Sequence, residues 1–164
     1  MFLAVGAVSC PGPDIEFDPY VPVTVYCPRS GTLLDPPKYL RFHEGRNLLE
    51  LKFHPKAGDL LELVLVSAID ARVIDETLGS VIEAEEGVVP TIDPTSGNSA
   101  DGTCLTIDIY EDHLKLGLES EGSVIRWISS RLIAFGLTPD SVVSEIRIML
   151  NPAVRSSLLE SIRR

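Results

Sequence analysis

The first 28 residues contain no lysine or arginine, and no apolar run in the chain approaches the length of a membrane span. A membrane-crossing helix needs about 20 apolar residues. A secretory signal needs a basic start, roughly 7–15 apolar residues and a small-residue cleavage site. Residues 2–8 are apolar for only seven positions, and no basic residue precedes them. We therefore expect this stretch to be a first strand, in a cytoplasmic protein that does not bind membranes.

Cysteine is also scarce, and its spacing excludes a disulfide framework. The three cysteines, Cys10, Cys27 and Cys104, are far apart in the chain and odd in number. Small secreted domains that depend on disulfides carry a denser and usually even set. This pattern indicates reduced thiols, in agreement with a cytoplasmic location.

Motifs that mark catalysis or cofactor binding are missing from the sequence. It has no G-x-S-x-G, no phosphate-binding loop of the Walker type and no G-x-G-x-x-G. A phosphatase loop starting at Cys27 would need an arginine six residues later, where Leu33 stands. His43, His54 and His113 lack the spacing that places metal ligands on one face. We therefore expect no cofactor, no metal and no enzymatic activity.

What the sequence does contain is an uneven distribution of charge. The net charge is −10, but residues 59–121 hold fifteen acidic and only two basic residues, a net −13, whereas the remaining residues sum to +3. Such a field repels nucleic acids and anionic lipids and attracts basic protein surfaces. The acidic residues that we expect to contact a partner are Asp75, Glu76, Glu83, Glu85, Glu86, Asp93, Asp101, Glu111 and Asp112.

A second unusual segment, residues 10–46, is rich in proline and aromatic residues. Seven of the twelve prolines lie between Pro11 and Pro37, and five of the ten aromatic residues lie between Phe17 and Phe42. Stiff backbone combined with aromatic contact area suits a binding loop, although rings that fill the core would give the same pattern. A pocket there would be lined by the following residues: Tyr20, Tyr39, His43 and His54.

The periodicity of apolar residues predicts a single α+β domain over residues 1–164, with a largely antiparallel sheet and about three helices packed on it. The expected strands are residues 2–8, an edge strand at 21–27, two strands within 47–66 joined by a turn at 55–59, a hairpin at 105–118, and a strand at 142–150. The expected helices are residues 67–79, 124–135 and a last one from Pro152; at 67–79 the alternative is that the preceding strand continues. Residues 93–103 read as a polar loop.

Two of these elements carry details that a structure can test. If Glu111 and Asp112 form the turn of the hairpin at 105–118, then Asp108 lies opposite Lys115 and Ile107 lies opposite Leu116. In the last helix, Asn151 is the expected N-cap and Pro152 the first residue, the position that proline favours. Its buried stripe should contain the apolar residues Val154, Leu158, Leu159 and Ile162.

The charge pattern favours a non-catalytic binding module over an enzyme. Bacterial immunity and antitoxin proteins are small, acidic and cytoplasmic, and those that inhibit nucleases meet a basic substrate cleft with their own carboxylates. We therefore expect an inhibitor that neutralises a basic, nuclease-like toxin and does not bind nucleic acid directly. The alternative is a small-molecule-binding protein or enzyme, with its pocket near the proline- and aromatic-rich segment and His43 or His54.

Overall fold

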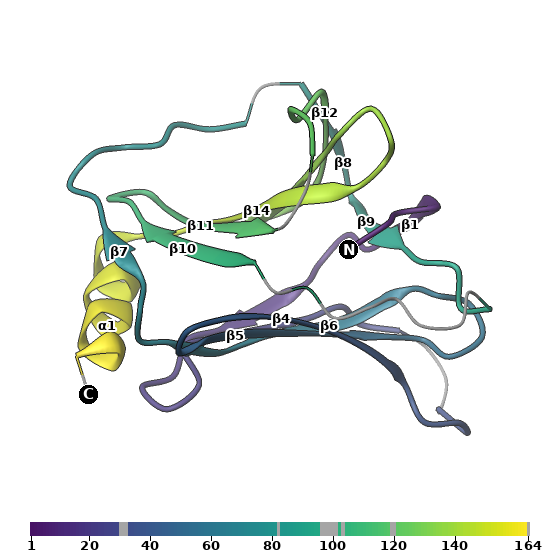
Figure 1. Ribbon diagram of the computed structural model, residues 1–164, viewed down its shortest axis with the longest axis horizontal. Helices are drawn as coiled ribbons and strands as arrows, with labels where there is room; N and C mark the ends of the chain where they lie inside the picture. Colours follow the sequence, from purple (N-terminus) through teal and green to yellow (C-terminus); the bar gives the residue numbers. More distant parts are fainter. Residues whose placement is uncertain (30–32, 82, 96–101, 103, 119–120, 164) are drawn as a thin grey trace.

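The protein is a β-sandwich, described by a computed structural model for residues 1–29, 33–81, 83–95, 102, 104–118 and 121–163. Strands make up 50% of the chain and helix 7%, and the described residues form three sheets and one helix. The expected α+β domain with three helices is therefore wrong. Figure 1 shows the two main sheets as stacked layers, with the helix at one end of the stack.

Five strands form the first layer, in the order β2–β3–β6–β5–β4, and every pair is antiparallel. The strands are β2 (Asp14–Glu16), β3 (Val23–Tyr26), β4 (Lys38–Glu44), β5 (Asn47–Phe53) and β6 (Leu60–Ala68). Alternation along β5 buries Leu49, Leu51 and Phe53 against the second layer, while Glu50 and Lys52 lie on the outer face. This is the period-two pattern of a sheet with one face against the core and one toward solvent.

The second layer has seven strands, in the order β7–β10–β11–β14–β13–β12–β8. The strands are β7 (Arg72–Val73), β8 (Ala84–Glu86), β10 (Leu105–Ile109), β11 (His113–Leu118), β12 (Arg126–Ser130), β13 (Ile133–Leu137) and β14 (Val143–Met149). Its inner face carries buried residues such as Ile107, Leu116, Phe135 and Ile146. Only the two short edge strands run parallel to their neighbours, β7 beside β10 and β8 beside β12.

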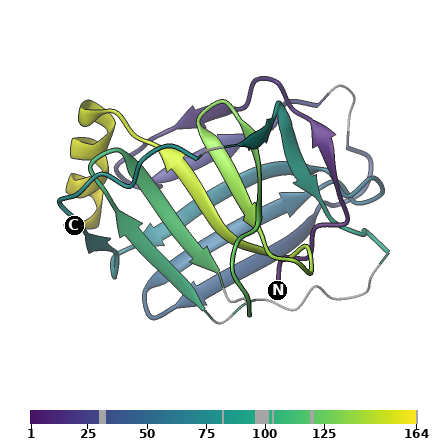
Figure 2. The ribbon, with the colours of Figure 1, turned by 90° about the horizontal axis from the view of Figure 1, so that it is seen from above.

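A small third sheet and the helix complete the molecule. The small sheet pairs β1 (Gly6–Ser9) with β9 (Val88–Thr91), and the chain before β1 places the Phe2 ring edge-on against Phe53, with ring centroids 5.5 Å apart. The helix α1 (Pro152–Ile162) lies across one end of the sandwich, beside β7 (Figures 1 and 2). It buries Leu158 fully, with three other apolar residues packed against the core.

Several local predictions are confirmed. β10 and β11 form the expected hairpin, and its register places Asp108 opposite Lys115 and Ile107 opposite Leu116. β5 and β6 pair through the turn at 55–59. The side chain of Asn151 accepts a hydrogen bond of 2.8 Å from the N–H of Val154 at the start of α1.

Two predicted helices are strands instead. At 124–135 the chain forms the β12–β13 hairpin, and at 67–79 it leaves β6, bends and forms β7. Pairing of β12 and β13 with β8 and β14 buries Ile128, Ile133 and Phe135, whereas Ile125 and Leu132 of the expected helix are exposed. Non-local pairing therefore outweighs the helical pattern, as is common for short apolar segments.

The expected edge strand at 21–27 is also corrected, because β3 lies between β2 and β6. Pro22 precedes β3, so its missing N–H removes no ladder hydrogen bond. Residues 2–8 are buried on one side only: Phe2 and Ala4 are buried, whereas Leu3 and Val5 are exposed. Of the polar loop at 93–103, positions 96–101 and 103 lie outside the described residues.

Candidate functional site

An acidic segment crosses the outer face of the seven-stranded sheet between β7 and β8 (Figures 1 and 2). Residues 75–86, here called the acidic strap, contain five acidic residues and no lysine or arginine. Residue 82 is outside the part of the strap that the structure describes. The strap therefore places most of the predicted contact residues on one side of the molecule.

The loop between β10 and β11 holds the first half of the strap in place. The carboxylate of Asp112 accepts hydrogen bonds from the N–H groups of Leu78 and Gly79, at 2.7 and 2.9 Å. The N–H of Glu111 donates to the carbonyl of Glu76 at 2.9 Å. Backbone donors that a strand ladder would satisfy are here satisfied by one carboxylate, which fixes the path of the strap.

The pKa of Asp112 reflects this role. Burial raises the pKa, but the two backbone N–H groups and the neighbouring His113 outweigh it and lower the pKa from 3.8 to about 2. Hydrogen bonds to the charged form stabilise the carboxylate in this way. Asp112 is thus a positioning residue for the strap, whereas the sequence pattern had placed it among the contact residues.

Replacing Asp112 by asparagine should destabilise the fold by about 1–3 kcal/mol near pH 7, because charge-assisted hydrogen bonds are lost. The folded-state pKa is lowered, so the contribution of the carboxylate is present above pH 3.8 and is lost as the pH falls toward 2. In urea unfolding, the difference in the free energy of unfolding between wild type and Asp112→Asn should therefore decrease as the pH falls through this range. Glu111→Gln, an exposed neighbour, should change stability by less than about 0.5 kcal/mol. A difference in the free energy of unfolding that does not change with pH would contradict this role.

The predicted contact residues fall into two groups along the strap. Asp75 and Glu76 lie near the exposed Glu111 at one end, and Asp75 forms an ion pair of 3.1 Å with Arg155 of α1. At the other end, the carboxylates of β8 and of the residue before it are exposed. These are Glu83, Glu85 and Glu86.

Two predicted residues do not belong to either group. Asp93 lies beyond β9, where its carboxylate accepts hydrogen bonds from the N–H and hydroxyl of Thr95, at 2.8 and 2.7 Å. Asp101 lies outside the described residues. The exposed carboxylates at 83, 85 and 86 are therefore the densest group of predicted residues that form no salt bridge with another described side chain.

A cleft of about 310 Å³ lies between the second half of the strap and the outer face of the sheet. Glu83 and Glu86 of the strap line it, together with His113 and Arg147 of the sheet, which forms the floor, and Arg131 of the β12–β13 turn. Glu83 and Arg131 both have a positive φ, 59° and 50°. Backbone strain of this kind in non-glycine residues gathers at functional sites.

The floor of the cleft is ordered by contacts among its side chains. The Arg147 guanidinium lies over the Trp127 ring, 4.6 Å from its centroid, and its Nε donates to Glu145 at 2.5 Å. The His113 imidazole is buried, and its Nδ1 is 3.1 Å from Oδ2 of Asp112 but makes no hydrogen bond to any described group. Charges of both signs thus line a partly enclosed space, which suits a polar ligand or side chain of a partner.

The cationic side of this cleft was not predicted from the sequence. Arg131 falls within the helix expected at 124–135, whereas it lies in the turn of the β12–β13 hairpin. Arg147 was part of a predicted strand with no assigned role. Burial alternates along β12, but its sequence, Arg-Trp-Ile-Ser-Ser, does not alternate between apolar and polar residues, so no local signal indicates a strand here.

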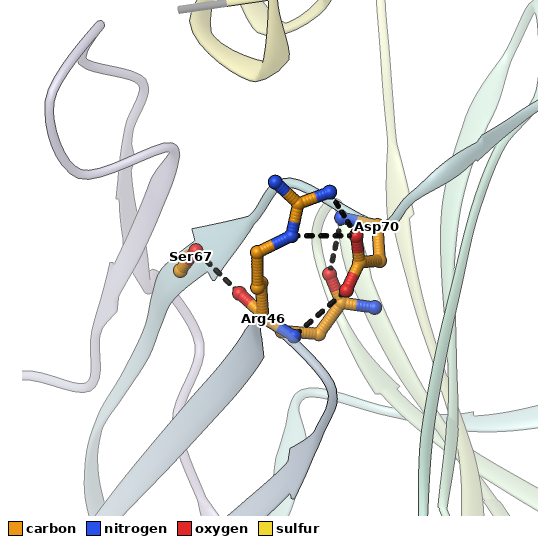
Figure 3. Close-up of polar contacts among 4 residues, drawn as sticks. Arg46, Ser67 and Asp70 are labelled. Atoms are coloured by element: carbon orange, nitrogen blue, oxygen red, sulfur yellow. Dashed lines mark hydrogen bonds and ion pairs between the residues drawn. The ribbon is translucent and has the colours of Figure 1, made fainter.

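A second polar cluster joins the β4–β5 turn to the end of β6 (Figure 3). The Arg46 guanidinium donates to Asp70 at 2.6 and 3.0 Å, and the Arg46 N–H donates to the same carboxylate at 2.7 Å. The Ser67 hydroxyl donates to the Arg46 carbonyl at 2.6 Å, and the Asp70 N–H donates to Asn47 at 2.9 Å. The polar groups of this cluster are therefore paired with one another, and the Arg46 side chain is the main cause that lowers the pKa of Asp70. The cluster stabilises the β4–β5 turn against the end of β6.

Among the described residues, the side chains expected at the alternative pocket lie at separate places in the fold. His54 accepts hydrogen bonds from the N–H groups of Lys56 and Ala57 at its Nδ1, and so belongs to the β5–β6 turn. His43 is exposed on β4, and Tyr20 is 82% exposed. Tyr39 lies under the Arg41 guanidinium on the outer face of the five-stranded sheet, at 5.1 Å.

Within the described ranges, no three histidine, cysteine or acidic side chains are grouped as metal ligands would be. None of the described helices is long and apolar enough to cross a membrane.

No protein-family model matches the sequence, and no curated protein resembles it closely enough to count as a relative.

Proposed function

We propose that the protein is a non-catalytic binding module that neutralises a basic, nuclease-like toxin in the cytoplasm, in the manner of an immunity or antitoxin protein. The observation that supports this most directly is the acidic strap, with its exposed carboxylates and no base of its own. A segment of one sign of charge steers a partner of opposite sign and excludes partners of like sign.

The attachment of the strap favours binding as well. Asp112 holds its first half and pairing with β12 holds β8, so its carboxylates do not have to be ordered when a partner binds. Preorganisation of this kind reduces the entropic cost of association. The cleft behind the strap offers a place for one side chain of the partner, with Glu83 and Glu86 at its rim to receive a lysine or arginine.

The proposal predicts a large electrostatic contribution to the association rate. Neutralising the strap with Glu83→Gln, Glu85→Gln and Glu86→Gln should slow association with the toxin about tenfold or more at low salt. The control is Asp14→Asn, Glu16→Gln and Glu160→Gln, which removes the same charge from exposed positions elsewhere and should change the rate less than about threefold. Stopped-flow mixing over a range of salt concentrations measures both.

The partner is first sought among basic proteins encoded next to the gene, by co-purification. Equal slowing in both triple variants would show that net charge alone acts and would remove the strap from the proposal. Failure of every basic neighbour to form a complex, together with turnover of a small molecule that His43→Ala abolishes, would replace the proposal by the alternative.

Small-molecule binding is the second candidate function. The observation that favours it is the cleft under the strap, which is lined by the buried His113, by two arginines and by two glutamates. This location differs from the proline- and aromatic-rich segment that the sequence pattern indicated.

A further inference from the structure

Cys10 and Cys27, which are seventeen positions apart in the chain, line the same cavity. Cys10 follows β1 and Cys27 follows β3. The Cys10 N–H donates to Gly87 at 2.8 Å, and its carbonyl accepts a hydrogen bond from the Ser130 hydroxyl. The Cys27 N–H donates to Leu61 at 2.9 Å. Each cysteine is therefore fixed by neighbouring strands.

The two thiols share one wall of a cavity of about 310 Å³ that opens to solvent. Cys10 is 2% and Cys27 7% exposed, and Arg29 and Asp59 form an ion pair at the same cavity. Burial, with a smaller contribution from the adjacent Cys10 thiol, raises the pKa of Cys27. The two thiols are thus close enough to interact, and both cysteines border the same cavity.

We propose that Cys10 and Cys27 form an oxidation site, at which a small disulfide such as oxidised glutathione converts the two thiols into an intramolecular disulfide. One cysteine thiolate attacks a sulfur of the small disulfide, which releases one thiolate and leaves a mixed disulfide. The second cysteine attacks the protein sulfur of that mixed disulfide and releases the other thiolate. The two cysteine protons end on the two released thiols, so the protein is oxidised by two electrons and the small disulfide is reduced by two.

This bond would connect the small β1–β9 sheet to the five-stranded layer. It closes the loop of residues 10–27, which contains β2 and much of the proline-rich segment. A cross-link over such a loop reduces the entropy of the unfolded chain. The oxidised protein should therefore melt about 5 °C or more above the reduced protein.

The test is to incubate the folded protein with excess oxidised glutathione and to map its peptides without reduction. The expected product is a monomer that has lost two hydrogen atoms, with Cys10 linked to Cys27, and dithiothreitol should reverse it. Cys104 is half-exposed and provides the control, because Cys104→Ser should give the same product at the same rate. Cys27→Ser should instead retain a glutathione adduct on Cys10.

Three results would overturn the proposal. The first is modification of Cys104 while Cys10 and Cys27 stay reduced, and the second is a stable disulfide between Cys104 and either of them. The third is a melting temperature that falls on oxidation, since the folded backbone would then not accommodate the bond. Peptide mapping of the wild-type chain decides the question even if Cys27→Ser does not fold.

Discussion

Gly58→Ala should lower the free energy of unfolding of this protein by about 3–5 kcal/mol, which is a large share of the stability of a domain of this size. Gly58 lies in the β5–β6 turn with φ of +77°, a conformation that residues with a side chain rarely adopt. A Cβ at this position would lie 1.9 Å from the carbonyl oxygen of Ile92. Urea unfolding followed by circular dichroism measures the loss.

The neighbouring backbone cannot move aside to accept the methyl group. The Gly58 N–H donates to His54 at 3.0 Å, and the Gly58 carbonyl accepts from the N–H of Ile92 at 2.9 Å. Next to this hydrogen bond, Asp59 and Thr91 form an antiparallel β-bridge. Relief of the clash would therefore break the connection between the turn and the segment after β9.

Gly87 provides a matched control for this substitution. Its φ of +78° is almost the same, but a Cβ there meets no atom within 4 Å. Gly87→Ala should therefore lower the free energy of unfolding by only about 1–2 kcal/mol, the cost of placing alanine in this backbone conformation. Equal losses in Gly58→Ala and Gly87→Ala would show that backbone conformation, and not the contact with Ile92, sets the cost at Gly58.

Phe53→Ala should destabilise the fold by about 3–5 kcal/mol, because it removes a fully buried ring from the centre of the sandwich. The ring lies edge-on to Phe2, with an interplanar angle of 84°. Phe2 is also fully buried, so Phe2→Ala should lose a comparable amount. Leu34→Ala, at a side chain that is 90% exposed, should change stability by less than about 0.5 kcal/mol.

The double variant measures the contact between the two rings. The combined loss should be smaller than the sum of the single losses by about 0.5–1.5 kcal/mol, since the second substitution removes a contact that the first has already broken. Strictly additive losses would mean that the N-terminal segment packs independently of β5, against the arrangement described here.

Local patterns predicted two hairpins and the terminal helix of this fold. The β10–β11 register follows from matching Asp108 with Lys115 and Ile107 with Leu116 across a short turn. Helix α1 follows from Asn151 and Pro152, since an N-cap and a first-turn proline act within a few residues. The β5–β6 hairpin follows from alternation and one turn cluster.

The same local reasoning failed where two periodicities were both possible. Apolar residues at 124–135 satisfy a helical stripe, yet the segment forms β12 and β13 because β14 and β8 offer strand partners there. At 67–79 the chain leaves β6 at Ala68 and joins a different sheet at β7. Neither the partner strands nor the change of sheet is visible in a window of a dozen residues.

The candidate site shows the same division. Its carboxylates were predicted from charge alone, because a run of acidic residues without bases is typical of exposed surface. The cleft behind them was not predicted, since it brings Arg131 from a hairpin turn and Arg147 from β14 to a segment that precedes both by more than forty residues.

The sequence by itself determined the charge distribution, the β5–β6 and β10–β11 hairpins and the capped terminal helix, because each depends on residues that are neighbours in the chain. Tertiary structure alone decided that the fold is a sandwich, that Asp112 holds the acidic strap, and that Cys10 and Cys27 line one cavity. These features depend on which strands pair and which faces bury one another. That choice is made by the packing of the whole core, in which distant segments compete for the same partners.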